Sequence, residues 1–159
     1  MNPYGKFLEG QNYMDVLEAT PLALASATGS IGDTGLGRSY HPGKWTAAQI
    51  LCHLADCEIA FGFRMRQALV ENPHLVQPFD QESWAKSYDS LDPQMALETF
   101  TALRTWNLSF LKAQDAGAFS RIIRHPERGE MTLEGMLELI AGHDLNHRKQ
   151  LETIAAAAA

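Results

Sequence analysis

The chain has 159 residues, of which 45% are hydrophobic and 20% are charged, and its formal net charge is −6. This length suits one domain with a hydrophobic core, so we expect a single domain over residues 1–159. An acidic chain lacks the basic surface that binds phosphate backbones, which argues against a nucleic-acid partner. It contains no apolar run long enough to span a membrane and no apolar secretion signal, so we expect a cytoplasmic protein with no membrane partner.

Two helices are predicted in the first half of the chain. The first covers about residues 7–27, and Thr20-Pro21 either bends it or restarts it, because proline lacks an amide hydrogen. A glycine-rich connection follows and ends near Gly43. The second helix begins at a capping box, Thr46 to Gln49, and runs to about Val70. Its apolar stripe consists of Ile50, Leu54, Cys57, Phe61, Met65 and Ala68, with His53 and Arg64 along one edge.

Two more helices are predicted in the second half, separated by irregular segments. Residues 73–90 show no sustained periodicity and are expected to form a long structured loop. The third helix begins with Asp92 as N-cap and Pro93 in its first turn, and ends near Gln114. Residues 118–130 include an extended, strand-like piece. The fourth helix follows Thr132 as its cap, and the helix-favouring run Ala155–Ala159 extends it. Four amphipathic helices predict an all-α fold, a four-helix bundle.

The fourth helix places polar side chains in its apolar stripe. His143 and His147 are four residues apart and therefore share one face, which also carries Asp144. Such groups cost free energy in a core unless they are paired or bind metal. A third imidazole, from His53 on the second helix, would complete a ligand set that leaves one coordination position open, as in catalytic sites. We therefore predict that His53, His143 and His147 bind a divalent metal ion; hydrogen-bonded core histidines are the alternative.

Asp144 and Asp56 are the candidate catalytic residues. Each could orient a histidine ligand by accepting the hydrogen of its free ring nitrogen. A capping or solvent contact is the alternative for each of them. His41 and His125 lie in predicted loops and are not expected to bind the metal.

The cysteines and one basic group leave further alternatives. Cys52 and Cys57 are five residues apart on one helix, which disfavours a disulfide, and we expect buried free thiols in a reducing compartment. Cys57 lies one turn from His53, so a fourth metal ligand is the alternative reading. The basic residues of segment 121–128 are expected in a solvated loop; a small anion-attracting rim beside a pocket is the alternative. They are Arg121, Arg124 and Arg128.

An ordered set of short motifs resembles the DinB-like superfamily. The set is Pro42-Gly43-Lys44-Trp45-Thr46, then His53-Leu54-Ala55-Asp56, then His143-Asp144-Leu145-Asn146-His147. The resemblance extends over nearly the whole chain, and it implies a four-helix bundle of the DinB-like type with a divalent metal on the three histidines. Zinc or nickel are the expected ions. It also implies a homodimer, in which Phe63, Phe79 and Trp84 could bury apolar surface, and it implies no DNA binding.

Characterised members of that family include transferases that couple a low-molecular-weight thiol to electrophiles. We therefore expect a metal-dependent thiol S-transferase acting in detoxification or stress response, with a small-molecule thiol and an electrophile as partners. Three neutral ligands leave the cation electron-poor, so it lowers the pKa of a bound thiol or water. Activated water would instead hydrolyse an amide-like substrate, so a metal-dependent hydrolase is the alternative, and a non-catalytic metal-binding stress protein is the third.

Overall fold

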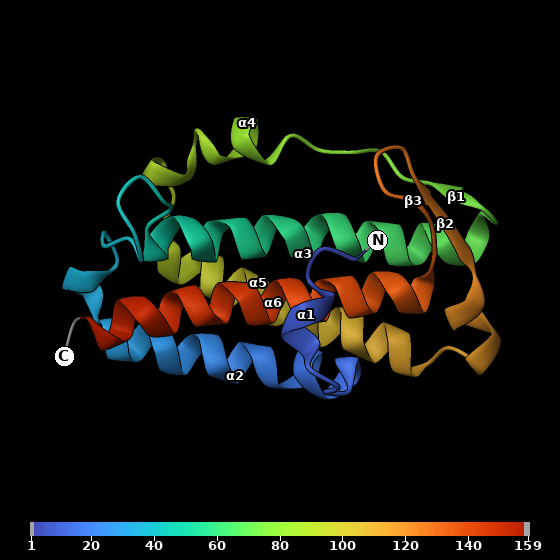
Figure 1. The fold of residues 1–159 in the computed structure, drawn as a ribbon, viewed down its shortest axis with the longest axis horizontal. Coiled ribbons are helices and arrows are strands. Elements are labelled where there is room, and N and C mark those ends of the chain that lie inside the picture. The colour runs from blue at the N-terminus through green and yellow to red at the C-terminus, as the bar shows by residue number, and fades with distance from the viewer. Residues whose placement is uncertain (1, 158–159) are drawn as a thin grey trace.

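A computed structural model describes residues 2–157 as a bundle of four long helices with a small sheet at one end (Figure 1). The predicted four-helix bundle is confirmed, and the sheet is an addition to it. The end of the predicted helical run, residues 158–159, lies outside the described residues. The helices are α1 Gly5–Leu8, α2 Tyr13–Ile31, α3 Ala47–Val70, α4 Gln81–Ala85, α5 Pro93–Lys112 and α6 Leu133–Ala156. Short 3-10 helices occupy Asp33–Gly35, Tyr88–Ser90 and Ala116–Ser120.

The long helices pack in the cyclic order α2, α6, α3, α5. Helices α3 and α5 run in the same direction although they follow each other, because the connection that carries α4 returns along the outside of the bundle (Figure 1). Helix α6 runs antiparallel to α3 and lies beside it. Side chains of α3 and α6 can therefore meet in the bundle. Among residues 2–157, no helix is long and apolar enough to cross a lipid bilayer.

Side-chain caps set the starts of three long helices where the sequence predicts them. Thr46 and Gln49 form the capping box of α3, with bonds of 3.2 and 2.9 Å. Asp92 accepts a bond from the backbone amide of Gln94 at 2.9 Å and begins α5. Thr132 accepts from the amide of Gly135 at 3.0 Å and begins α6. Each cap satisfies an amide that the first turn of a helix leaves without a partner.

The first predicted helix differs from the structure. The chain forms the short α1 and then restarts as α2 at Tyr13, where the Asn12 side chain accepts bonds from two backbone amides. Helix α2 continues past Pro21, which excludes a restart at Thr20-Pro21, one of the two predicted alternatives there. The new helix begins after Asn12 because the Asn12 side chain accepts hydrogen bonds from amides of its first turn. The Pro21 side chain has no acceptor atom and cannot cap a helix in this way.

Three short strands form a sheet at one end of the bundle. They are β1 His74–Leu75, β2 Ile122–His125 and β3 Gly129–Thr132. Strand β1 pairs parallel to β2, and β2 pairs antiparallel to β3. The strand-like piece predicted within residues 118–130 is thus confirmed. The prediction of a long loop over residues 73–90 is incomplete, since this segment contains β1, α4 and a 3-10 helix.

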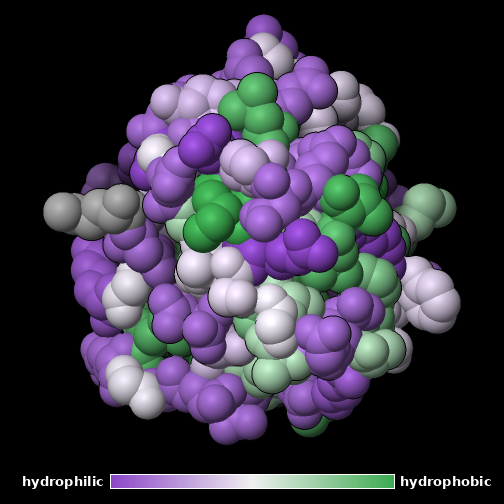
Figure 2. Space-filling view, turned by 90° about the vertical axis from the view of Figure 1, so that its right-hand side faces the viewer, coloured by the Kyte–Doolittle hydropathy of each residue, from purple (hydrophilic) through white to green (hydrophobic). Residues whose placement is uncertain are grey.

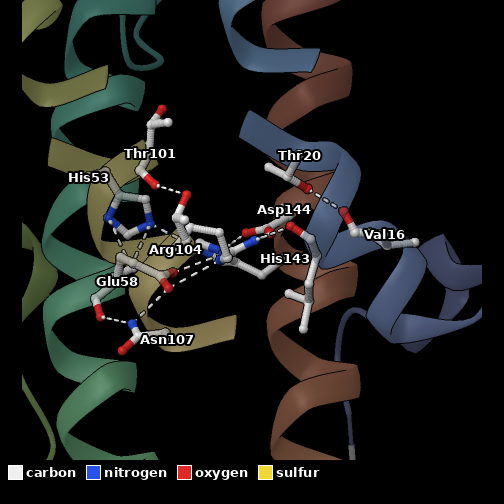
Figure 3. Close-up of polar contacts among 12 residues, drawn as sticks. Val16, Thr20, His53, Glu58, Thr101, Arg104, Asn107, His143 and Asp144 are labelled. Atoms are coloured by element: carbon white, nitrogen blue, oxygen red, sulfur yellow. Dashed lines mark hydrogen bonds and ion pairs between the residues drawn. The ribbon is translucent and has the colours of Figure 1, made fainter. Parts of the chain in front are cut away.

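A buried ion-pair network lies in the middle of the bundle. Arg104 of α5 donates to both carboxylate oxygens of Glu58 on α3, at 3.1 and 2.8 Å. It also donates to Asp144 on α6 at 2.7 Å and to the carbonyl of Leu17 on α2 at 3.2 Å. Figure 3 shows Arg104 between Glu58 and Asp144. One guanidinium group therefore contacts all four long helices, its own included.

The network also needs close helix packing. Asn107 of α5 donates to Glu58 at 2.9 Å, and it lies directly against Gly62 of α3. A Cβ atom at Gly62 would come within 2.7 Å of the Asn107 amide. Glycine at this position therefore allows α5 to approach α3 closely enough for the ion pairs to form.

Replacing Arg104 with methionine should destabilise the protein by about 3–5 kcal/mol, because two buried carboxylates lose their counter-charge. Urea unfolding followed by circular dichroism measures this change. The matched control is Lys112→Met, which removes an exposed ion pair with Glu18 (2.9 Å) and should cost less than about 1 kcal/mol. Equal losses in the two variants would show that the Arg104 network does not hold the bundle together.

Candidate metal centre

Three imidazoles meet between α3 and α6. The Nε2 atom of His53 lies 3.0 Å from Nε2 of His143, which lies 3.1 Å from Nε2 of His147. All three side chains are buried. One of them comes from α3 and two from the same face of α6, one turn apart. The structure thus brings together the three histidines that the sequence predicted as ligands.

The arrangement of these nitrogens fits a shared cation. Nitrogens that each lie ~2.1 Å from one ion are about 3.0–3.4 Å apart in octahedral or tetrahedral geometry. Nδ1 of His147 lies 2.8 Å from Oε1 of Gln150. With its ring hydrogen directed at that oxygen, His147 presents the lone pair of Nε2 to the other two rings. Imidazole nitrogen is a suitable donor for a divalent metal. Two of the three nitrogen separations, His53 to His143 and His143 to His147, fall within this range of about 3.0–3.4 Å.

Burial keeps two of the imidazoles, His53 and His147, neutral. Burial and, to a lesser extent, the nearby His143 lower the pKa of His53 to about 3. Burial, His143 and His53 hold the pKa of His147 well below its usual value. Neutral imidazole is the form that ligates metals, so protons do not compete for His53 and His147 at neutral pH.

A thiol lies beside the histidines. Sγ of Cys57 is 3.5 Å from Nε2 of His53, and donor atoms of His53, Cys57 and His143 lie within 4.8 Å of one another. Burial, together with nearby carboxylates, raises the pKa of Cys57 far above its usual value. Cys57 is therefore a protonated thiol at neutral pH when no cation is bound. Cys52 and Cys57 are both free and buried, as predicted.

The two aspartates predicted to orient the histidines have other partners. Asp144 accepts from Arg104, and its second oxygen lies 3.9 Å from Nδ1 of His143, too far for a hydrogen bond. Burial alone would raise the pKa of Asp144, but Arg104 and His143 together hold this pKa below its usual value. Asp56 accepts from the Tyr88 hydroxyl at 2.8 Å. Nδ1 of His143 has no hydrogen-bond partner in the part of the chain that is described.

Aromatic rings cover the histidines on two sides. The Trp45 ring lies 4.7 Å from the ring of His53 and 6.4 Å from that of His147. The Tyr4 ring meets His143 edge-on at 5.2 Å. A Cβ atom at Gly142 would come within 2.5 Å of the Tyr4 carbonyl oxygen. Glycine at position 142 therefore allows the N-terminal segment to cross α6 next to His143.

A cavity of about 610 Å³ opens beside His53 and His143. A volume of this size suits a small-molecule ligand. The cavity extends toward the sheet end of the molecule, where hydrophilic residues surround separate hydrophobic groups (Figure 2). Its apolar lining includes Phe61, Val76, Ile123, Met131, Met136 and Leu139, and its charged lining is Arg64, Asp80, Glu127 and Arg128.

A sequence model of the DinB superfamily matches residues 17–151. The chain belongs to the DinB superfamily. The resemblance predicted from the three short motifs is thereby confirmed, and the matched range contains His53, His143 and His147.

Relatives and solved structures agree with this assignment. YfiT of Bacillus subtilis, named as a candidate metal-dependent hydrolase, is 30% identical over 138 residues, which cover 85% of this chain and 78% of YfiT. A protein of Oceanobacillus iheyensis with the same description is 26% identical over 143 residues, covering 89% and 83% of the two chains. The YfiT structure, a four-helix bundle of unusual topology, matches with a TM-score of 0.85 at 27% identity over 91% of this chain and 85% of that one. The mycothiol-dependent maleylpyruvate isomerase shares the fold, with a TM-score of 0.71 at 15% identity over 87% and 59% of the chains.

Two residues of the cavity, Tyr4 and Arg64, were not predicted from the sequence as site residues. A signal for Arg64 exists, because it lies on the same edge of the α3 stripe as His53. The two are eleven residues apart, which is about three helical turns. Tyr4 gives no comparable signal, since its place depends on how the N-terminal segment crosses α6.

Changing His147 to alanine should lower metal affinity at least about a hundredfold. Loss of a residue that only orients a ligand already costs up to about a hundredfold in affinity, and His147 is itself a proposed ligand. Elemental analysis of protein purified without a histidine tag measures this loss, and circular dichroism should show that the helices persist. His125→Ala is the matched control, since His125 also lines the cavity but belongs to β2 rather than to α3 or α6. Full metal occupancy in the His147→Ala protein would contradict the assignment.

Proposed function

We propose that this protein is a metal-dependent S-transferase that couples a low-molecular-weight thiol to an electrophile. The observation that carries the proposal is the convergence of three imidazole nitrogens beside a cavity large enough for a small molecule, with His53 and His143 in the cavity wall. In this proposal His53, His143 and His147 hold a divalent ion, with zinc or nickel expected from the nitrogen donors. The thiol and the electrophile bind in the cavity.

When bound, such a cation lowers the pKa of a thiol at its open position and stabilises the thiolate. The histidines carry no charge of their own, so they leave the positive charge available to an anionic sulfur. The apolar side chains of Phe61, Met136 and Leu139 line the cavity next to the site and keep water away from the sulfur. Sulfur then forms a bond to the electrophilic carbon as the leaving group departs, and the thiol proton is released to solvent.

The carboxylates around the site favour thiol transfer over hydrolysis. Cleavage of an amide needs a proton for the departing amine, usually from a positioned side chain. The carboxylates that line the cavity, Asp80 and Glu127, are exposed to solvent. Asp144 lies behind the histidines and is paired with Arg104. Alkylation of a thiolate requires no such proton donor.

Hydrolysis is the second candidate, because the most similar relatives reported above are named as metal-dependent hydrolases. The Tyr4 hydroxyl would be its proton donor, since Tyr4 lines the cavity and contacts His143. Burial raises the pKa of Tyr4, so the hydroxyl keeps its proton at neutral pH.

Metal-loaded protein should conjugate a general electrophile such as monobromobimane to at least one of bacillithiol, mycothiol and glutathione. We expect the rate to exceed background by at least about a hundredfold. Holding the thiol next to the electrophile and lowering the thiol pKa toward neutral pH each accelerate a reaction on this scale. The rate should fall to background in the His147→Ala protein. Fluorescence of the conjugate measures both rates.

The same proteins should be assayed with a chromogenic amide and no thiol. Metal-dependent amide cleavage with no thiol conjugation would replace the proposed function by the hydrolase. Absence of both activities in metal-loaded protein would favour a metal-binding protein without catalysis.

We further propose that the protein forms a homodimer through the outer face of α3 and α5. Ile59, Phe63 and Trp106 are 53%, 60% and 66% exposed on these two neighbouring helices. Exposed apolar side chains on two adjoining helices are suited to a protein contact. Phe79 is less suited to this role, because it stacks on Trp84 within the chain at 4.7 Å.

Sedimentation velocity should show a dimer at micromolar concentration. A Phe63→Glu variant should be monomeric, because a charge would be buried in the interface. Leu22→Glu is the matched control, since Leu22 is 78% exposed on α2 and lies outside this face. A monomeric wild-type protein would overturn the dimer.

A further inference from the structure

The bundle buries two arginines, and only one of them has counter-charges. Arg104 is paired with Glu58 and Asp144, as described above. Arg64 is only 8% exposed, yet no ion pair to a carboxylate forms within residues 2–157. Its one hydrogen bond in that range goes to the carbonyl oxygen of Gln77 at 2.9 Å. A buried cation without a counter-ion is costly, so its retention in a cavity wall suggests that a ligand supplies the charge.

The Arg64 side chain is held in place for such a contact. Its guanidinium carbon lies 5.7 Å from the centre of the Phe61 ring and 5.3 Å from that of Phe79. Two aromatic faces and one carbonyl fix the guanidinium plane, while its remaining N–H groups are available to the cavity that Arg64 lines. A fixed guanidinium plane is suited to bidentate binding of a carboxylate or phosphate.

Other charged groups of the cavity lie nearer to solvent. Arg128 is exposed and adds positive charge near Arg64, while His125 is half-buried beside them. Two carboxylates also line the cavity. Asp80 is exposed and caps α4 through bonds to Ser83 and to the Glu82 amide, and Glu127 is exposed. The buried charge of the cavity is therefore positive, and the acidic groups remain at its solvent side.

Arg64 lies close to the histidines along the same cavity. The Phe61 ring is 6.3 Å from the His143 ring and 5.7 Å from the guanidinium carbon of Arg64. Both groups thus lie next to the Phe61 ring, and an extended molecule passing Phe61 can reach both. The cavity volume of about 610 Å³ accommodates such a molecule.

We propose that Arg64 is an anion-binding residue, assisted by Arg128, and that it selects substrates carrying a carboxylate or phosphate at the end opposite to the reacting thiol. This inference rests on the proposed function, because it assumes that the thiol binds at the histidines. It names the chemical class of the thiol substrate: an elongated, anionic molecule rather than a neutral one.

Calorimetric titration of cobalt-loaded protein tests the proposal with defined probes. They are mercaptohexanoate, the neutral mercaptohexanol and the thiol-free hexanoate. Wild-type protein should bind mercaptohexanoate at least about tenfold more tightly than mercaptohexanol, because a charge-assisted hydrogen bond is lost with the neutral probe. Arg64→Gln should abolish this preference. Arg38→Gln, which removes an exposed positive charge outside the cavity, should retain it.

The cobalt absorption spectrum separates the two proposals. A thiol that reaches the metal should add a sulfur-to-cobalt charge-transfer band. If neither thiol produces the band, the thiol function fails, whereas binding of hexanoate to wild type but not to Arg64→Gln still supports the anion subsite. Equal affinity for the charged and neutral thiols, or a preference that persists in Arg64→Gln, would overturn it. If the Arg64→Gln protein does not fold, Arg64→Lys is the second variant. Lysine keeps the positive charge but cannot bind a carboxylate through two parallel N–H groups, so we expect its preference for mercaptohexanoate over mercaptohexanol to be smaller than that of the wild type.

Discussion

The position of the candidate site depends on one buried guanidinium group. Arg104 binds Glu58 and Asp144, and these residues lie close in sequence to the histidines: Glu58 five residues after His53, and Asp144 next to His143. Both ion pairs therefore fix the rotation and the axial position of α3 and α6 relative to each other. Apolar packing alone tolerates small shifts between helices, whereas a buried charge pair does not. This explains how imidazoles ninety residues apart come within 3.0 Å.

The charges inside the bundle are separated into two environments. Around Arg104 the two carboxylates balance the guanidinium, and this cluster faces the core. On the cavity side His53 and His147 are neutral, and Arg64 has no carboxylate partner among the residues described. A divalent ion on the histidines would add more positive charge there. A chain with a net charge of −6 thus contains a cavity suited to anions, which its overall composition does not reveal.

Much of the fold and the set of three histidines could be predicted from the sequence, because local signals determine them. Caps at Thr46, Asp92 and Thr132 mark three helix starts, and the apolar stripe of α6 includes His147. The parallel pairing of β1 with β2 could not be predicted, since a two-residue strand has no periodicity and its partner lies about fifty residues away. The same holds for the contacts of Asp144, which depend on a guanidinium from another helix.

The burial of Arg104 could have been predicted from the sequence. A helical wheel of α5 places two polar residues, Arg104 and Asn107, in the same buried stripe as Phe100 and Leu111. What the sequence could not supply is the pairing, since Glu58 and Asp144 are polar residues on two other helices. The same holds for Cys57. Its position one helical turn from His53 could be predicted from the sequence, but the 3.5 Å distance between its Sγ atom and Nε2 of His53 depends on the orientation of both side chains.

X-ray absorption spectroscopy of the purified metal-containing protein is the decisive measurement for the three-histidine site, because it reports the donor atoms around the ion. We expect three imidazole nitrogens, at about 2.0–2.2 Å if the metal is zinc. The remaining position should be taken by a light atom that sulfur replaces when a thiol is added. A coordination shell with at most one imidazole, or one dominated by sulfur before any thiol is added, would contradict the three-histidine site.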